Sequence, residues 1–341
     1  MNDRLRVVAA VGVTVLLFVL VQLGALALVE PFDAAERQAV EDPNDPTVSV
    51  IFFFVILVAT GLMLAAFKYD AQRLIRGLII GVSVMLAWFV FAEILPALVT
   101  VGSIGVFPIA AALGVGVALL AYPEWYVIDT AGVLMGAGAA GLFGISFGLF
   151  PAILFLAALA VYDAISVYKT RHMLSLAEGV MDLKIPVVLI VPTSLSYSYL
   201  ASGSTDGVIE DDSNETASEV NPAETTDGGS GEAMANGDVD PEEFERDALF
   251  IGLGDAVIPT ILVASAAYFL DVGAIDVPGI ALNVPALGAM LGTIAGLLIL
   301  MYMVLQGRPH AGLPLLNGGA ITGYLIGALA SGLSLMTAIG L

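Results

Sequence analysis

The chain has 341 residues, of which 59% are hydrophobic and only 13% are charged, and its formal net charge is −21. This balance excludes an ordinary soluble domain and indicates a membrane protein. The absence of cysteine excludes disulfide bonds and thiol catalysis, and the two histidines lie in polar stretches without the spacing of a metal site. We therefore expect no metal, no cofactor and no nucleic-acid partner.

Nine apolar runs, each long enough to cross a bilayer, follow one another along the chain. They comprise residues 7–29, 48–67, 78–99, 101–122, 127–147, 151–168, 248–270, 280–305 and 313–339. The first run follows two arginines and is longer than the apolar core of a signal peptide, so we interpret it as a membrane helix. The sequence thus predicts an all-α membrane protein with nine transmembrane helices.

A long polar segment between the sixth and seventh runs divides the chain into three regions. We assign residues 1–170 to an N-terminal six-helix membrane region and residues 248–341 to a C-terminal three-helix membrane region. Residues 171–247 are assigned to a cytoplasmic linker between them.

The linker contains three kinds of sequence. Residues 173–183 carry apolar residues near helical spacing, which predicts a short amphipathic helix on the membrane surface. Residues 185–191 form a β-branched run that is too short to span a bilayer. Residues 202–247 contain nearly half of the acidic residues and almost no bulky apolar one, so we predict a solvated, disordered tract.

The basic residues predict the orientation of the chain. If the N-terminus is cytoplasmic, every lysine and arginine except Arg37 falls on the cytoplasmic side. Cytoplasmic loops of membrane proteins carry this excess of positive charge. We therefore expect a multi-pass protein of the cell membrane with its N-terminus inside and its C-terminus outside.

Two aspartates lie inside apolar runs at nearly the same depth. Asp163 lies about 9 Å before Lys169, and Asp255 lies about 12 Å beyond Asp247, if each run is a helix. A carboxylate at this depth is costly unless it is paired, solvated or protonated. Two neighbouring carboxyls do not both ionise cheaply, so one can keep a proton while the other activates a water molecule. The pair predicts aspartyl protease chemistry, although a proton carrier or an ion channel uses acids in the same way.

Three motifs occur in a fixed order along the chain. Asp163 follows Tyr162, Asp255 ends the motif Gly252-Leu253-Gly254-Asp255, and Pro314-Leu315-Leu316 opens the last apolar run. The two glycines lack a Cβ atom, so they allow a substrate backbone or a neighbouring helix to approach closely.

The ordered motifs and the arrangement of the runs resemble the presenilin and signal peptide peptidase family of intramembrane aspartyl proteases, and most closely its archaeal members. The resemblance implies a presenilin-like fold and cleavage of peptide bonds within transmembrane segments of membrane proteins or remnant signal peptides. It also implies that Asp163 and Asp255 are catalytic. The supporting residues of the active site would be Tyr162, Gly252, Leu253, Gly254, Pro314, Leu315 and Leu316.

One motif departs from the family pattern. The usual Pro-Ala-Leu-Pro reads here as Pro314-Leu315-Leu316-Asn317, without the second proline. The segment Pro285-Ala286-Leu287 matches the letters better, but it precedes the eighth run instead of the ninth, so we assign the motif to Pro314. Because proline restricts the residue before it and lacks an N–H, we expect the ninth helix to begin at or just after Pro314.

Two further acids are interpreted as structural. Glu93 lies deep in the third run, where it is expected to pair with another helix or to face an internal water. Asp129 lies at the start of the fifth run, where the N-terminus of a helix stabilises an acid.

The expected partners are the lipid bilayer and transmembrane substrate helices, and a homo-oligomer is compatible with the sequence. A substrate helix must unwind before it is cut, and its extended strand then needs pairing, for which residues 185–191 and 313–316 are the candidates. Three other functions use some of the same features. They are a prepilin-type peptidase, a proton-coupled carrier and a non-proteolytic membrane scaffold.

Overall fold

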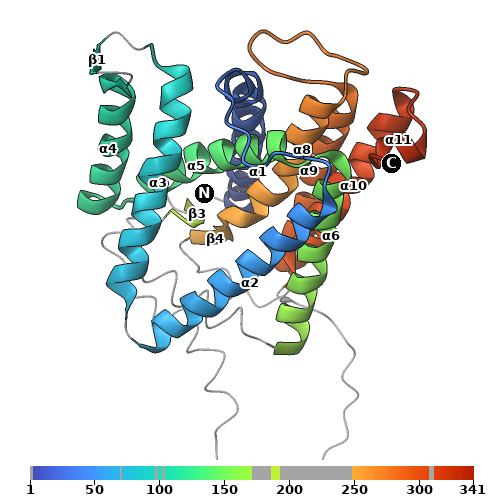
Figure 1. Cartoon of the computed structure of the whole chain (residues 1–341). Coiled ribbons are helices and arrows are strands. Elements are labelled where there is room, and N and C mark those ends of the chain that lie inside the picture. The colour runs from blue at the N-terminus through green and yellow to red at the C-terminus, as the bar shows by residue number, and fades with distance from the viewer. Residues whose placement is uncertain are drawn as a thin grey trace, which may run out of the picture.

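The computed structural model of the chain describes residues 3–69, 71–96, 99–101, 104–170, 186–192, 248–306 and 311–341 (Figure 1). Its helices are α1 (Asp3–Ala34), α2 (Pro46–Lys68), α3 (Gln72–Ile94), α4 (Val106–Ala121), α5 (Trp125–Ser146), α6 (Leu149–Ile165), α8 (Leu253–Phe269), α9 (Val284–Val304), α10 (Gly312–Ala330) and α11 (Leu335–Ala338). The π-helical turn η1 (Ser166–Thr170) follows α6. The described strands are β1 (Thr100–Val101), β2 (Ile104–Gly105), β3 (Val188–Pro192) and β4 (Ala248–Gly252). The predicted amphipathic segment and acidic tract of the linker lie outside the described residues.

The described part of the chain is predominantly helical, as the sequence predicts. Seven of its helices are long and apolar enough to cross a membrane, namely α1, α2, α3, α5, α6, α9 and α10. The apolar helices α4 and α8 are shorter, with 16 and 17 residues, and extend about 25 Å. The hydrocarbon core of a bilayer is about 30 Å thick, so the count of nine spans stays a prediction.

The structure corrects the boundaries of three predicted runs. Residues 248–252 form the strand β4 instead of the start of a helix, because they pair with β3. The third run ends at Ile94, before Pro96, so Glu93 lies in the last turn of α3 and not deep within a span. The ninth run is interrupted after α10, where Gly332 adopts a φ of +84° that ends the helix.

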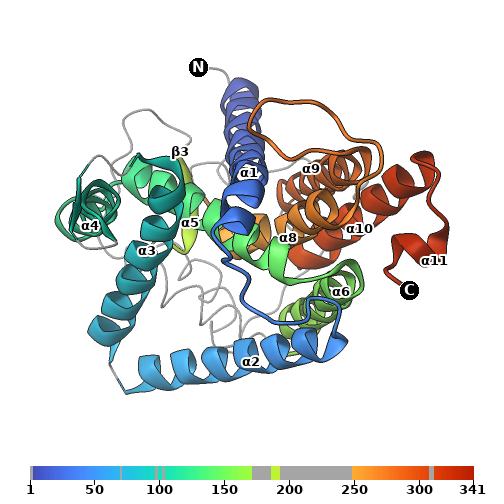
Figure 2. The ribbon, with the colours of Figure 1, turned by 45° about the horizontal axis from the view of Figure 1, so that its top comes forward.

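α5 lies at the centre of the bundle, where it packs against α1, α3 and α8. Small residues on α5 allow this close packing. A Cβ atom on Gly144 would lie 2.3 Å from the Cβ of Ala264 on α8, so only glycine fits there. Figure 2 shows α2 by contrast at one edge of the molecule, beside α6.

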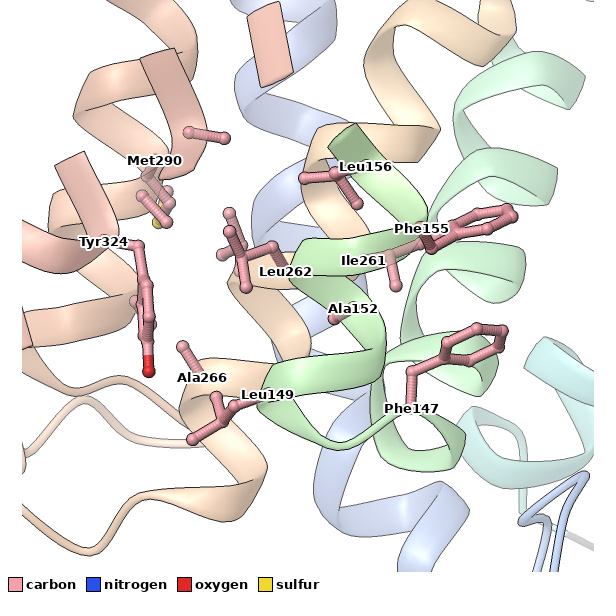
Figure 3. Close-up of a cluster of buried hydrophobic side chains, with 14 of the residues drawn as sticks. Phe147, Leu149, Ala152, Phe155, Leu156, Ile261, Leu262, Ala266, Met290 and Tyr324 are labelled. Atoms are coloured by element: carbon pink, nitrogen blue, oxygen red, sulfur yellow. The ribbon is translucent and has the colours of Figure 1, made fainter. Parts of the chain in front are cut away.

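One hydrophobic core joins the two membrane regions on either side of the linker. Figure 3 shows Leu156 of α6 close to Leu262 of α8, with Tyr324 of α10 in the same cluster. Phe147, between α5 and α6, is also fully buried in this cluster. The N-terminal and C-terminal membrane regions are therefore packed as one body, and this common core sets the position of α6 relative to α8 and α10.

Helices α9 and α10 are antiparallel and touch backbone to backbone. Along their contact, Gly288, Gly292 and Gly296 of α9 face residues of α10 that include Gly319, Gly323 and Gly327. A Cβ atom on Gly292 would lie only 2.0 Å from the carbonyl oxygen of Gly319. The helix pair therefore depends on glycine at these positions, and it places the N-terminus of α10 beside the C-terminal half of α9.

Candidate active site

Asp163 lies in the last turn of α6 and is buried, with 5% of its surface exposed. The apolar sequence of α6 packs against α8 and α10, which turns this end of the helix towards both. The helix changes to the π-helical turn η1 just after Asp163. The carboxyl group thus faces the interior of the bundle instead of the lipid.

Asp255 is the third residue of α8 and lies in its first turn. The helix N-terminus is a favourable place for a carboxylate, because unpaired N–H groups point towards it. Gly252 precedes the helix as its N-cap, and a Cβ atom there would lie 3.4 Å from Oδ2 of Asp255. A side chain at this position would cover the carboxyl group. Gly254 faces only the tip of Ile258, so its missing side chain leaves open space.

The N-terminus of α10 brings the two carboxyls together. The N–H of Leu313 donates a hydrogen bond of 3.1 Å to Oδ2 of Asp163, and the N–H of the neighbouring Gly312 faces the same carboxyl. A Cβ atom on Gly312 would lie 3.5 Å from each carboxyl oxygen of Asp255. Gly312 therefore lies between Asp163 and Asp255, which are close enough to interact electrostatically.

These backbone donors explain where α10 begins. The prediction that the helix starts at or just after Pro314 is off by two residues, since α10 starts at Gly312. Pro314 occupies the third helical position, where an N–H would have no partner within the helix, so its lack of an N–H costs no hydrogen bond. The sequence predicts this turn from Pro314 but not the role of Gly312 and Leu313, because every residue except proline has a backbone N–H and the residue type does not show where it points.

Leu315 and Leu316 support the site indirectly. Leu316 is fully buried in a cluster with Phe18 of α1 and Leu297 of α9. The carbonyl of Leu315 approaches Gly296 so closely that a Cβ atom there would lie 2.4 Å away. Both residues therefore seat α10 against its neighbours.

Pro285 lies at the other end of the helix pair. A Cβ atom on Gly327 would lie 2.9 Å from the Cα atom of Pro285. Gly327 is about 22 Å along α10 from Gly312. The structure thus separates Pro285-Ala286-Leu287 from the two aspartates and places the segment at Pro314 beside them.

Two other polar residues link helices near the site. The ring of Tyr162 packs edge-on against Phe53 of α2, with 6.1 Å between the ring centres. The side chain of Asn317 donates a hydrogen bond of 2.9 Å to the carbonyl of Leu156. Asn317 stands where the family pattern has its second proline, and here it ties α10 to the helix that carries Asp163.

Glu93 has a structural partner away from the site. Oε1 of Glu93 accepts hydrogen bonds from Nε and Nη2 of Arg37, at 3.2 and 2.9 Å. The guanidinium group of Arg37 also lies 5.0 Å from the ring centre of Phe89. This contact joins the segment after α1 to α3, as the interpretation of Glu93 as a paired acid requires.

A two-stranded antiparallel sheet leads into the site. Leu189 of β3 pairs with Ile251 of β4, and β4 ends at Gly252, next to the helix that carries Asp255. Asp129 of α5 accepts a hydrogen bond of 2.7 Å from the N–H of Ile190 in β3. The sequence alone does not predict this partner of Asp129, because it does not show that linker residues form a strand beside the fifth run.

The chemistry of the site is that of two carboxyls and backbone N–H groups. Within the described residues, no three histidine or acidic side chains gather as ligands of a metal ion. The geometry can therefore hold one negative charge and one proton between two carboxyls, with backbone donors to stabilise the charge.

Comparisons with known proteins show the family to which the chain is similar. A family model described as signal-peptide peptidase, presenilin aspartyl protease matches residues 15–333. A solved structure described as a presenilin family intramembrane aspartate protease, in space group C222, is 32% identical and superposes with a TM-score of 0.61, covering 94% of this chain and 99% of that one. A second, described in the same words and in space group P2, is 31% identical with a TM-score of 0.59 and covers 93% and 96% of the two chains. Comparison with curated protein sequences finds no match.

Proposed function

The chain belongs to the signal peptide peptidase and presenilin family of intramembrane aspartyl proteases, and we propose that Asp163 and Asp255 are its catalytic pair. The observation that carries this proposal is their meeting at Gly312 and Leu313. Two acids from helices on either side of the linker converge on one helix N-terminus. A carrier or a prepilin-type peptidase finds no such support in the comparisons.

The hydrogen bonds assign a role to each carboxyl. Asp163 accepts the hydrogen bond of the Leu313 N–H and faces the N–H of Gly312. Backbone donors favour the charged form of a carboxyl, so we assign Asp163 the role of base. Asp255 then carries the shared proton. Asp163 removes a proton from a water molecule as its oxygen attacks the scissile carbonyl carbon, and Asp255 gives its proton to the carbonyl oxygen. The resulting diol collapses when Asp163 gives the proton that it took from water to the nitrogen and Asp255 takes a proton from one diol hydroxyl. The C–N bond breaks, the products are a carboxylic acid and an amine, and the pair returns to its starting protonation.

The substrate is a transmembrane segment of another protein, and its peptide bonds are hidden while it is helical. In a helix each carbonyl group accepts a hydrogen bond from a backbone N–H of the same helix, so the segment must first become extended before a carbonyl is accessible. In the membrane an extended strand needs a pairing partner, which the edge of a sheet provides. We infer that the partner is β4, because this strand runs directly to Gly252 and hence to Asp255.

The sequence suggests two other segments for this pairing, residues 185–191 and residues 313–316. The first contributes β3, which pairs with β4, and the second is less suited to the task. The N–H of Leu313 already donates to Asp163, so it is not available to bond to a substrate strand at the turn of residues 313–316. We therefore assign to this turn the support of the catalytic carboxyl and to the sheet the binding of the extended substrate.

The orientation and the regions of the chain follow from the same proposal. We infer that the N-terminus and the acidic tract of residues 202–247 are cytoplasmic, that the C-terminus is outside, and that the protein lies in the cell membrane. The catalytic pair then lies on the cytoplasmic side of the bilayer.

The deciding experiment is cleavage of a reporter transmembrane segment by the purified chain in detergent. We expect cleavage by the wild type, and loss of cleavage with normal folding in Asp163→Asn and in Asp255→Asn, because one carboxyl cannot act as both base and acid. Glu93→Gln is the matched control, since it neutralises a membrane acid far from the site. Substantial cleavage by either aspartate variant would disprove the assignment.

A further inference from the structure

A buried acid outside the catalytic pair holds the edge of β3. Oδ1 of Asp129, on α5, accepts a hydrogen bond of 2.7 Å from the N–H of Ile190. Only 6% of Asp129 and 1% of Ile190 is exposed. A buried acid is costly unless its bonds compensate the lost hydration, so this contact calls for an explanation.

The ladder between β3 and β4 shows which edge Asp129 occupies. The N–H of Leu253 donates to the carbonyl of Val187 at 2.8 Å, and the register continues with Leu189 opposite Ile251. Hydrogen-bonded pairs alternate along an antiparallel ladder, so the N–H of Ile190 points away from β4. Asp129 therefore meets β3 on its outer edge.

The rest of the outer edge of β3 presents few backbone N–H donors to another strand. Pro192 has no N–H, and the N–H of Ile190 is engaged by Asp129. Of the residues of β3 that face outwards, only Val188 retains a donor for a further strand. The outer edge of β3 is thus closed at its centre and at one end.

The surface of α5 is shaped to receive this strand. Ile128 packs in one buried cluster with Ile190, on the turn that also carries Asp129. One turn further along, a Cβ atom on Gly132 would lie 3.2 Å from the side chain of Leu189. Asp129 supplies the polar contact in an otherwise apolar seat for β3.

We propose that Asp129 is a positioning residue that closes the outer edge of β3, so that a substrate strand pairs with β4 alone and is cut in one register. This inference rests on the proposed function, in which the substrate is extended beside Asp255. Asp129 is connected to the catalytic site through three elements. It bonds to β3, β3 pairs with β4, and β4 continues into α8, which carries Asp255.

The first test compares substitutions at Asp129 in the full chain in detergent. Asp129→Ala removes the acceptor, whereas Asp129→Asn keeps an amide oxygen that can accept the same bond. The matched control is Thr130→Ala, since Thr130 is exposed and its hydroxyl bonds only within α5, to Tyr126. The measured quantities are the masses of the cleavage products, kcat and KM.

We expect Asp129→Ala to raise KM by about tenfold and to add products displaced by two residues, because a strand keeps its faces only when it slips by an even number. Asp129→Asn and Thr130→Ala are expected to give the wild-type products. Unchanged products and KM in a folded Asp129→Ala variant would overturn the proposal. So would an Asp129→Asn variant that behaves like Asp129→Ala.

A second test needs no substitution at Asp129 and serves if Asp129→Ala does not fold. Hydrogen exchange is followed in the full-length Asp255→Asn chain, with and without a peptide that spans the reporter's cleavage region. We expect the peptide to slow exchange in residues 248–252 and to leave the exchange of the Ile190 amide, which is bonded to Asp129, unchanged. Slowing in residues 188–192 without any in 248–252 would overturn the proposal.

The two proposals fail in different ways. If the wild type does not cleave the reporter, the catalytic assignment fails. If the wild type cleaves and Asp255→Asn does not, the catalytic assignment stands, and the products of Asp129→Ala then test the role of Asp129 alone.

Discussion

The α9–α10 pair and α2 are opposite extremes of packing in the same molecule. Glycines bring the backbones of α9 and α10 into contact along their length. Helix α2 packs mainly on α6 and to a lesser extent on α3, at the edge of the bundle. Its exposed residues include Val50, Ile51, Phe54, Val55, Val58 and Leu62. This apolar surface is suited to contact with lipid.

The proposed catalytic pair, Asp163 and Asp255, lies between these two regions. On one side, Leu313 and Gly312 belong to the α9–α10 pair, where Leu313 donates a hydrogen bond to Asp163 and Gly312 lies beside Asp255. On the other side, Tyr162, the neighbour of Asp163, faces Phe53 of α2. The geometry of the carboxyls therefore depends on the glycine interface. Changes in α2 are expected to affect that geometry less.

The largest effect is expected from Gly292→Ala. The new methyl group would lie 2.0 Å from the carbonyl oxygen of Gly319, so α9 and α10 must separate. We expect the free energy of unfolding to fall by about 3 kcal/mol, and cleavage to be lost as the N-terminus of α10 moves. Thermal unfolding in detergent and the reporter assay measure the two effects.

Gly61→Ala in α2 is the matched control for Gly292→Ala. A Cβ atom at Gly61 has no neighbour within 4 Å, so stability and cleavage are expected to match the wild type. Equal losses in the two variants would contradict the contrast between the helix pair and α2.

The next effect is expected from Pro314→Ala. Loss of the ring relaxes the first turn of α10, which holds the N–H groups of Gly312 and Leu313 on Asp163. We expect kcat to fall by roughly tenfold, because small displacements of a catalytic group are costly. The pH optimum should not move, since no titratable group is removed.

Pro285→Ala is the control for this substitution, because Pro285 lies beside Gly327 at the far end of the helix pair. We expect its kcat to match the wild type in the same assay. A larger loss in Pro285→Ala than in Pro314→Ala would reverse the assignment of the motif.

A smaller effect is expected from Phe53→Ala. This change removes the edge-on contact with Tyr162 and leaves the glycine interface intact. We expect the free energy of unfolding to fall by about 1 kcal/mol and kcat to stay near the wild-type value. A loss of activity as large as that of Gly292→Ala would show that α2 holds the catalytic pair in place.

The smallest effect is expected from deleting residues 204–237. This stretch is acidic and poor in apolar residues, so it contributes little to the packed bundle. We expect thermal unfolding and reporter cleavage to match the full chain. A marked fall in either would show that the tract docks on the bundle.

Some parts of the site were predictable because their residue types are unusual for their surroundings. Asp163 and Asp255 are acids in apolar runs, and Pro314 is a proline at the start of such a run. The strand β4 was not predictable in this way. Its residues are as apolar as a helix that crosses a membrane, and only the pairing with β3 makes them extended.

The sequence by itself determined the membrane character, the family and the two carboxyls, because hydrophobic runs and buried acids are local properties of the chain. Only the tertiary structure decided what those carboxyls contact. The N–H groups of Gly312 and Leu313 and the contact between Asp129 and Ile190 involve residues far apart in the chain. Backbone donors carry no residue signature, so their partners become known only when the helices are packed together.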